Sequence, residues 1–356
     1  MSCNFPRIRA ETFEPYTNNK GGTSYKVEWL ERAQVDAAGG IQNLRKIFAN
    51  KYRKIQFTPC GQCINCLLED SRQKACQMLI HKEYGYHEVF DENGKPLDKG
   101  HKYPDGTVWF LTVTYKDEYL PTHKTLNTET GEIYEGISLS KEDHQDFIKR
   151  LRYAYPQMKI QYVMAGEYGS KTQRPHYHYI IYGLPLEQEQ FKKVGVNKLN
   201  QPTWELKKLS DIWGNGFVNI GRVTWESAAY VARYTLKKAF KKDKLWYEMQ
   251  GMVPEYIVWS NGIGKDYFEN NYKEIYKTDS VPIYSKKGLP RPPKSYDRML
   301  KEIDPKLYEE IKHKRDHAGR VSEKMENMCT DLTPEERRAI SEARMKQVMK
   351  DIRMEV

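Results

Sequence analysis

The chain has 356 residues and a formal net charge of +10, because 58 lysines and arginines exceed 48 aspartates and glutamates. No run of about eighteen apolar residues occurs, and the first residues lack the apolar stretch of a secretory signal, which argues against a membrane-spanning or exported protein. The basic charge favours polyanionic partners, and 26 tyrosines and 7 tryptophans among basic residues would suit single-stranded DNA or RNA, since rings stack on bases.

Three regions of different composition follow one another along the chain. Residues 1–104 look loop-rich and carry the cysteine-containing stretch PCGQCINC. Residues 105–300 hold nearly all the strand signals, and residues 301–356 are highly charged and helix-prone. We therefore expect one domain over residues 105–300, an N-terminal cysteine-containing extension, and a C-terminal tail of solvated helices with little core of its own.

The N-terminal region clusters its cysteines. Cys60, Cys63 and Cys66 are spaced CxxCxxC, and Cys76 follows ten residues later. In a reducing cytosol these residues favour a metal site or free thiols over disulfides. A structural Zn²⁺ held by the four cysteines is one interpretation, because the region is short of core residues. Free thiols in a tight turn are the other, because the spacing does not match a repeated C-x2-C pair.

The middle region predicts strands and helices in alternation. A helix should begin after Ser140, where Asp143 completes a pattern typical of a capping box, and another should run from about Thr224 to Phe240. Short β-branched and aromatic runs predict strands over residues 107–115, 159–168, 176–183 and 216–223. This order predicts an α+β fold, an antiparallel sheet with helices on one face.

Two histidines, His176 and His178, stand two positions apart at the start of the third predicted strand. Because side chains i and i+2 of a strand point to the same face, both imidazoles should project together. A hairpin would bring Glu167, at the end of the preceding strand, across from His176 or near it. Two imidazoles and a carboxylate with open positions suit Mg²⁺ or Mn²⁺ in contact with a phosphate. The alternative is two partly exposed histidines and an unrelated glutamate.

Two tyrosines lie one turn apart on the last predicted helix. Tyr230 and Tyr234 are each followed three residues later by a basic residue, Arg233 and Lys237. Both tyrosines lie far around the helix from its apolar stripe, so we do not expect them to be core contacts. A phenol, with a pKa of about 10, is a poor nucleophile, and the basic residues would favour phenolate or orient a phosphate. This placement permits attack on a phosphodiester; the alternative is packing of both rings against the sheet.

Together these segments resemble the HUH endonuclease superfamily, and more closely the replication initiator proteins of gokushovirus-type microviruses, which are small single-stranded DNA bacteriophages. FLTVTY corresponds to the first superfamily motif, RPHYHY to the metal-binding motif and YVARYTLKK to the two-tyrosine motif. The resemblance covers about residues 59 to 300 and also rests on PCGQCINCLLEDSRQKA, AGEYGSKTQRPHYHYIIYG, IWGNGFVNIG, SNGIGKDYF and GLPRPPKSYDRML.

The resemblance implies a role for each of these residues. His176 and His178 would ligate a metal with Glu167 as third ligand, and Tyr230 and Tyr234 would be the nucleophiles. Arg233 stands where lysine is common in relatives, and its bidentate phosphate binding differs from that of a lysine. We expect Tyr234 to act first, because Lys237 follows it in the commoner arrangement.

The resemblance also implies a fold and an activity. The fold would be that of HUH endonucleases, a central antiparallel β-sheet flanked by helices. The activity would be nicking at a phage origin through a 5′-phosphotyrosine intermediate, with rejoining that releases circular single strands. Expected partners are single-stranded and origin DNA, with host polymerase and helicase as further candidates, in the cytoplasm of the bacterial host and away from membranes.

Two other functions remain open from the residues alone. A non-catalytic single-stranded nucleic-acid-binding protein would use the basic and aromatic residues but does not require the histidine pair. A zinc-dependent hydrolase would use the histidines to bind a metal that activates water, and it leaves Tyr230 and Tyr234 without a task. A covalent protein–DNA adduct resistant to boiling in detergent would separate the strand transferase from the hydrolase.

Overall fold

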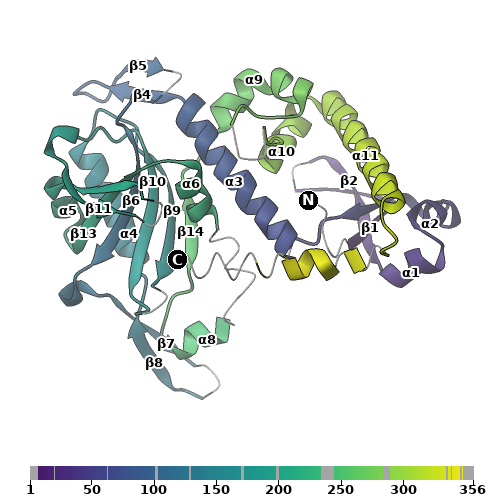
Figure 1. Cartoon of the computed structure of the whole chain (residues 1–356), viewed down its shortest axis with the longest axis horizontal. Helices are drawn as coiled ribbons and strands as arrows, with labels where there is room; N and C mark the ends of the chain where they lie inside the picture. The colour runs from purple at the N-terminus through teal and green to yellow at the C-terminus, as the bar shows by residue number, and fades with distance from the viewer. Residues whose placement is uncertain are drawn as a thin grey trace. The chain divides into compact units, whose positions relative to one another are not determined.

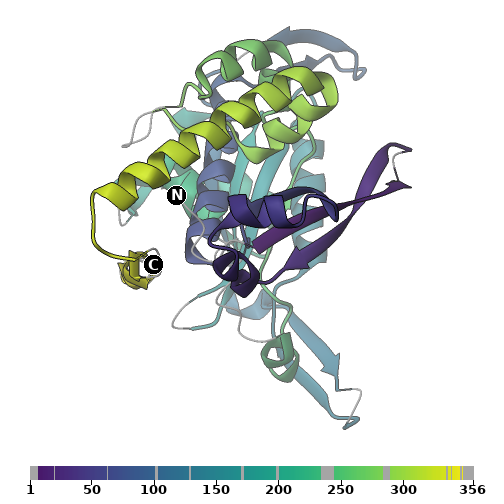
Figure 2. The same ribbon diagram turned by 90° about the vertical axis from the view of Figure 1, so that its right-hand side faces the viewer.

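The computed structural model divides into two compact units (Figures 1 and 2). The first comprises the described residues of Met1–Glu69 and Asp331–Ile352, and the second comprises those of Asp70–Thr330. The division expected from composition, at residues 104 and 300, stays a prediction. The described residues are 7–19, 21–61, 63–100, 103–127, 130–169, 172–197, 200–233, 244–283, 289–333, 336–337, 339–344 and 347.

A three-stranded antiparallel sheet organises the first unit. β1 (Arg7–Thr17) lies between β2 (Thr23–Leu30) and β3 (Tyr52–Thr58). Two short helices, α1 (Arg32–Ala37) and α2 (Ile41–Ile47), connect β2 to β3. The expectation of a loop-rich N-terminal region is therefore wrong. Each strand alternates polar and apolar residues and is interrupted by turn-forming ones, so the signal is weak until the strands pair.

The core of the first unit is small. Alternate residues of β1 are buried, because the period of two directs them to the face that the helices cover. The buried hydrophobic residues of this cluster, within the described part of the chain, are Ile8, Ala10, Val35, Leu44, Tyr52 and Ile55. The 21-residue helix α3 (Ile64–Tyr84) comes next, and the boundary between the units falls within it. A small hairpin of β4 (His87–Phe90) and β5 (Pro96–Gly100) follows.

A seven-stranded antiparallel sheet forms the centre of the second unit, in the order β11-β12-β13-β6-β10-β9-β14 (Figure 1). The four strands predicted from the sequence are confirmed as β6, β9, β10 and β13. The strands in chain order are β6 (Val108–Tyr115), β9 (Gln161–Tyr168), β10 (Pro175–Tyr182), β11 (Lys192–Val196), β12 (Pro202–Glu205), β13 (Gly216–Arg222) and β14 (Tyr256–Trp259).

Helices cover both faces of this sheet. On one face, α4 (Lys141–Ala154) and α5 (Lys207–Trp213) pack against the odd-numbered side chains of β10. On the other face, α6 (Trp225–Ala232) and the second half of α3 pack against Ile180 and Tyr182. The expectation of helices on one face only is wrong. Because β10 is apolar at both alternations, each of its faces requires cover.

Both predicted helix starts are confirmed. The side chain of Ser140 accepts a hydrogen bond from the backbone N–H of Asp143 at the start of α4. Thr224 caps α6 in a reciprocal capping box with Ser227. The helix predicted to reach residue 240 is described only to Ala232, since residues 234–243 lie outside the described part. The cap at Thr224 fixes where α6 begins over the sheet.

Further hairpins and helices complete the second unit. The hairpin of β7 (Thr122–Leu126) and β8 (Ile133–Ile137) projects from the sheet with α8 (Lys244–Met249) beside it (Figures 1 and 2). The remaining helices are α9 (Lys265–Thr278), α10 (Lys294–Ile303), α11 (Pro305–Met328) and the 3₁₀ turns Asp117–Tyr119 and Gln188–Gln190.

The start of the charged tail is helical, as expected, but it is not merely solvated. Ile311 of α11 is buried in the cluster that also contains Leu300 of α10. The expectation of helices with little core contact is therefore wrong for this stretch, because one apolar position per few turns suffices to dock a helix. None of the helices in the described ranges has the length and apolar character that crossing a bilayer requires.

Candidate active site

Strand β10 presents two histidines on one face of the sheet. His176 and His178 point to the α6 side, while Tyr177 and Tyr179 point into the core under α4. The imidazole rings lie with centroids 5.0 Å apart and perpendicular to each other. His178 is buried, with 7% of its surface exposed, and His176 is half-buried. The spacing of two residues therefore does bring both rings together.

Glu167 of β9 lies directly opposite His176 in the antiparallel register. Its Oε1 is 2.8 Å from Nε2 of His176 and 2.8 Å from Nε2 of His178. The carboxylate is almost fully buried, and burial alone would raise its pKa. The hydrogen bonds from His176 and His178 outweigh that effect and hold the pKa of Glu167 well below its usual range. The site thus contains a buried carboxylate in its charged form.

These donor atoms fit a divalent cation. The two imidazole nitrogens and the carboxylate oxygen all lie within 4.8 Å of one another. Imidazole and carboxylate together suit cations such as Mn²⁺, and carboxylate oxygen suits Mg²⁺. The structure therefore brings together the three residues that the sequence singled out as metal ligands.

Tyr230 of α6 reaches the same carboxylate. Its hydroxyl donates to Oε1 of Glu167 at 2.7 Å and lies 3.4 Å from Nε2 of His178. Its ring meets that of His178 edge-on, with centroids 4.9 Å apart. Tyr230 also packs against the core between the sheet and α6, so the expectation that it avoids core contacts is wrong. The reason is that α6 lies flat on the sheet, and a half-turn offset from the apolar stripe still faces β9 and β10.

The surroundings of Tyr230 favour its protonated form. Burial raises the pKa of Tyr230, and the charge of Glu167 raises it further. Arg233, at the C-terminal end of α6, acts in the opposite direction through its positive charge. The predicted partners Tyr234 and Lys237 lie outside the described residues. Of the predicted catalytic residues, the described structure therefore brings Tyr230 and Arg233 to the site.

Outer contacts orient both imidazoles, and the sequence analysis did not assign them. Nδ1 of His178 lies 3.0 Å from Oγ1 of Thr112 on β6, and Nδ1 of His176 lies 3.1 Å from the carbonyl oxygen of Arg174. Phe110 stacks on His178 at a centroid distance of 5.6 Å. With Nδ1 engaged outward, Nε2 of each ring faces the site. The signal was present in FLTVTY, because its alternate residues share a face of β6.

An exposed aromatic ring lies on the same face of the sheet. Thr114 of β6 is opposite His176 on one side and opposite Phe217 of β13 on the other. Phe217 therefore projects beside the site, about 10 Å from β10 at two strand spacings. It is 47% exposed, and Nζ of Lys116 lies 5.6 Å from its ring centroid. This pair offers a stacking surface next to a positive charge.

The cysteine cluster lies in the first unit. Cys60, Cys63 and Cys66 form a second group whose potential ligand atoms lie within 4.8 Å of one another. Cys76 does not belong to this group. It lies on α3 ten residues after Cys66, roughly 15 Å along the helix at 1.5 Å per residue. The expectation of four cysteines around one ion is therefore wrong in its fourth member.

The chain is similar to replication-associated proteins of small viruses. Residues 108–239 match a family described as replication-associated proteins of the ORF2 type. Replication-associated protein ORF2 of Spiroplasma virus 4 is 34% identical over 272 residues, which cover 74% of this chain and 74% of the relative. Replication-associated protein VP4 of Bdellovibrio phage phiMH2K is 28% identical over 274 residues, 73% of each chain.

Replication-associated protein ORF4 of Chlamydia phage 1 is 28% identical over 266 residues, which cover 71% of this chain and 58% of the relative. No solved structure matches the chain significantly. The family match spans β6, β9, β10 and α6, the four elements that carry the site.

Proposed function

The chain belongs to the ORF2-type family of replication-associated proteins, and we propose that it starts rolling-circle replication of a small phage genome by nicking one DNA strand at the origin. The observation that carries this proposal is the meeting of Tyr230 with Glu167, His176 and His178. A tyrosine hydroxyl is a nucleophile, and here it lies beside donors suited to a cation that binds phosphate.

In the proposed reaction, the hydroxyl oxygen of Tyr230 attacks the scissile phosphorus. The bond from phosphorus to the 3′ oxygen breaks, and a 5′-phosphotyrosine link forms. The phenol loses a proton and the departing 3′ oxygen gains one, so no water is consumed. The bond energy stays in the protein–DNA link, and the reverse attack by a 3′ hydroxyl rejoins the strand without ATP.

His176, His178 and Glu167 are the proposed ligands of Mg²⁺ or Mn²⁺. When bound, the cation would withdraw charge from the phosphate and stabilise the negative charge that develops on it. Thr112 and the carbonyl of Arg174 keep each Nε2 directed into the site.

Tyr234, Arg233 and Lys237 complete the proposal. Two nucleophiles permit a relay, in which one tyrosine holds the strand end while the other attacks the regenerated origin. Arg233 and Lys237 would bind the phosphate or favour phenolate. Which tyrosine acts first stays a prediction.

The proposed substrate is single-stranded origin DNA. Phe217 can stack on a base while Lys116 neutralises a neighbouring phosphate. The fold would be that of the HUH endonucleases, and the reaction would take place in the cytoplasm of the bacterial host, where host polymerase extends the freed 3′ hydroxyl and a host helicase opens the duplex.

The test compares nicking with binding on the single-stranded genome that encodes the chain. His176→Ala with His178→Ala should abolish nicking and leave salt-sensitive DNA binding within a few-fold of the wild type, because metal chemistry and phosphate neutralisation are separable. The exposed pair His123 and His313 provides a matched double-alanine control that should nick normally. Nicking at the wild-type rate without His176 and His178 would overturn the site assignment.

A further inference from the structure

We propose that Cys60, Cys63 and Cys66 bind one zinc ion that joins the end of β3 to the start of α3. β3 ends at Thr58, two residues before Cys60, and Cys66 lies in the first turn of α3. The site lies within the first unit and does not depend on the proposed nicking activity. Its three ligands come from a stretch of seven residues, so the local fold alone brings them together.

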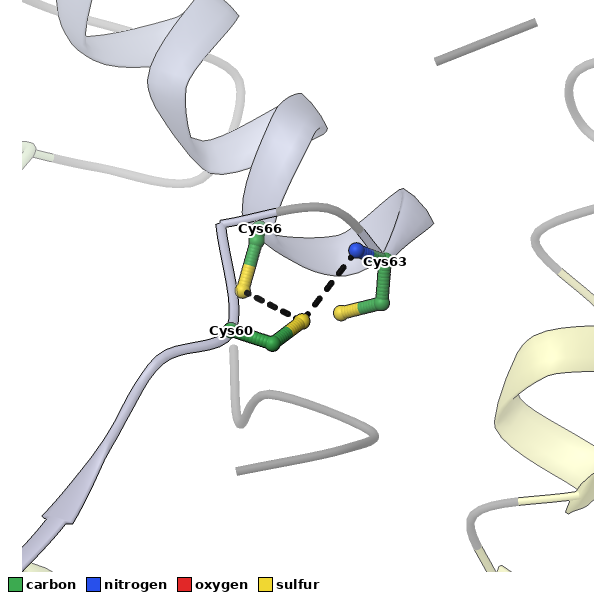
Figure 3. Close-up of side chains that lie close together, drawn as sticks. All are labelled: Cys60, Cys63 and Cys66. Atoms are coloured by element: carbon green, nitrogen blue, oxygen red, sulfur yellow. Dashed lines mark hydrogen bonds between the residues drawn. The ribbon is translucent and has the colours of Figure 1, made fainter. Parts of the chain in front are cut away.

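The sulfur positions fit zinc. The Sγ atoms of Cys60 and Cys66 are 4.0 Å apart, and all three sulfurs lie within 4.8 Å of one another. A tetrahedral zinc with Zn–S bonds of about 2.3 Å places its sulfurs about 3.8 Å apart. None of the three cysteines forms a disulfide, in which the sulfurs would approach to about 2.0 Å. Figure 3 shows the three side chains turned toward one another.

The spacing also distinguishes zinc from an iron–sulfur cluster. Each cysteine of a cubane cluster binds a different iron atom, so its thiolates surround the whole cluster and stand farther apart than ligands of a single ion. The 4.0 Å separation of Cys60 and Cys66 suits one ion. Three thiolates leave one tetrahedral position to another ligand.

The backbone favours negative charge at this position. The N–H of Cys63 donates to Sγ of Cys60 at 3.2 Å (Figure 3), a contact that stabilises a thiolate acceptor. The N-terminus of the 21-residue helix α3 adds the partial positive charge of its unsatisfied N–H groups. Soft thiolate ligands in such surroundings select zinc over Mg²⁺ or Mn²⁺.

The first unit has a physical need for such a link. Its described hydrophobic core consists of six buried residues, one of them an alanine. Small units with little core commonly gain stability from a structural metal. A zinc ion between β3 and α3 would fix the sheet to the helix that follows it.

The test measures zinc in the full chain, purified without chelator. We expect about one zinc per chain in the wild type, loss of that zinc in Cys63→Ser, and retention in Cys329→Ser, whose exposed cysteine lies outside the cluster. His176→Ala with His178→Ala should also retain the zinc, which separates this site from the active site. Replacement by Co²⁺ should give the charge-transfer absorption of thiolate–cobalt bonds, a readout that the wild type provides even if Cys63→Ser folds poorly.

Three outcomes would overturn the proposal. A stable wild type with neither zinc nor cobalt absorption would make these residues simple thiols. Bound iron with acid-labile sulfide would replace the single ion by a cluster. Zinc retained in Cys63→Ser and lost in the histidine variant would assign the metal to the other site.

Discussion

Thr112 provides a test of the site that depends on one hydrogen bond. Its hydroxyl lies 3.0 Å from Nδ1 of His178, on the side of the ring away from Glu167. Thr112→Val keeps the shape and β-branching of the side chain and removes this contact. Because this hydroxyl reaches the site through His178, we expect any loss of activity to act through the orientation of that ring.

The size of the effect follows from the role of such outer contacts. Removing a hydrogen-bond partner of a metal-binding histidine typically weakens metal affinity or activity about 10- to 100-fold. This corresponds to roughly 1.4 to 2.8 kcal/mol. His178 is only 7% exposed, so water cannot readily replace the hydroxyl.

The assay is nicking of single-stranded origin DNA at increasing Mn²⁺ concentration. Thr112→Val should shift the half-maximal Mn²⁺ concentration upward by this factor and approach wild-type activity at saturation. Thr112→Ser, which keeps the hydroxyl, should behave like the wild type. Thr114→Val, one position along the same face of β6, is the matched control. An unchanged metal dependence in Thr112→Val would refute the argument that this contact orients His178.

Three further perturbations follow from the same structure. Phe217→Ala should weaken single-stranded DNA binding by roughly 5- to 150-fold in a fluorescence titration, from about 1–3 kcal/mol per stacked base; an equal loss in Tyr153→Ala, an exposed ring on α4, would contradict a specific platform. Glu167→Gln should sharply reduce nicking and recover partly in excess Mn²⁺, and unchanged activity would move the third ligand elsewhere. Burial lowers the pKa of His81 and of His144 to about 4, below about 6.5 in an unfolded chain, so the unfolded state binds more protons and stability should fall as pH drops from about 6.5 toward 4. His81→Phe should flatten that fall in urea unfolding, and an unchanged slope would exclude His81 as its source.

The centre of the fold could be predicted because its signals are local. The four strands were recognisable as β-branched and aromatic runs, and the caps at Ser140 and Thr224 fixed two helix starts. The strands of the first unit were missed because Arg7–Thr17 is interrupted by proline and acidic residues, and its pairing partners are far apart in sequence. The resemblance to phage replication initiators is confirmed by the relatives.

The candidate site was predictable where spacing sets direction. Alternation on β10 placed His176 and His178 on one face, and the short hairpin placed Glu167 opposite His176. The contact of Tyr230 with Glu167 could not be derived in this way, since it depends on how α6 lies across the sheet. Thr112 was also missed, because a threonine in a strand has an ordinary role in β structure and only the register with β10 identifies its partner.

The central claim, attack by a tyrosine of the α6 segment on DNA, is tested most directly by the covalent adduct. The wild-type chain is incubated with an origin oligonucleotide and a divalent cation, denatured, digested and analysed by mass spectrometry. The account predicts DNA on Tyr230 or Tyr234, an adduct in at least one of the single phenylalanine variants, and none in Tyr230→Phe with Tyr234→Phe. An adduct on any other residue, or full nicking and joining by the double variant, would contradict the mechanism.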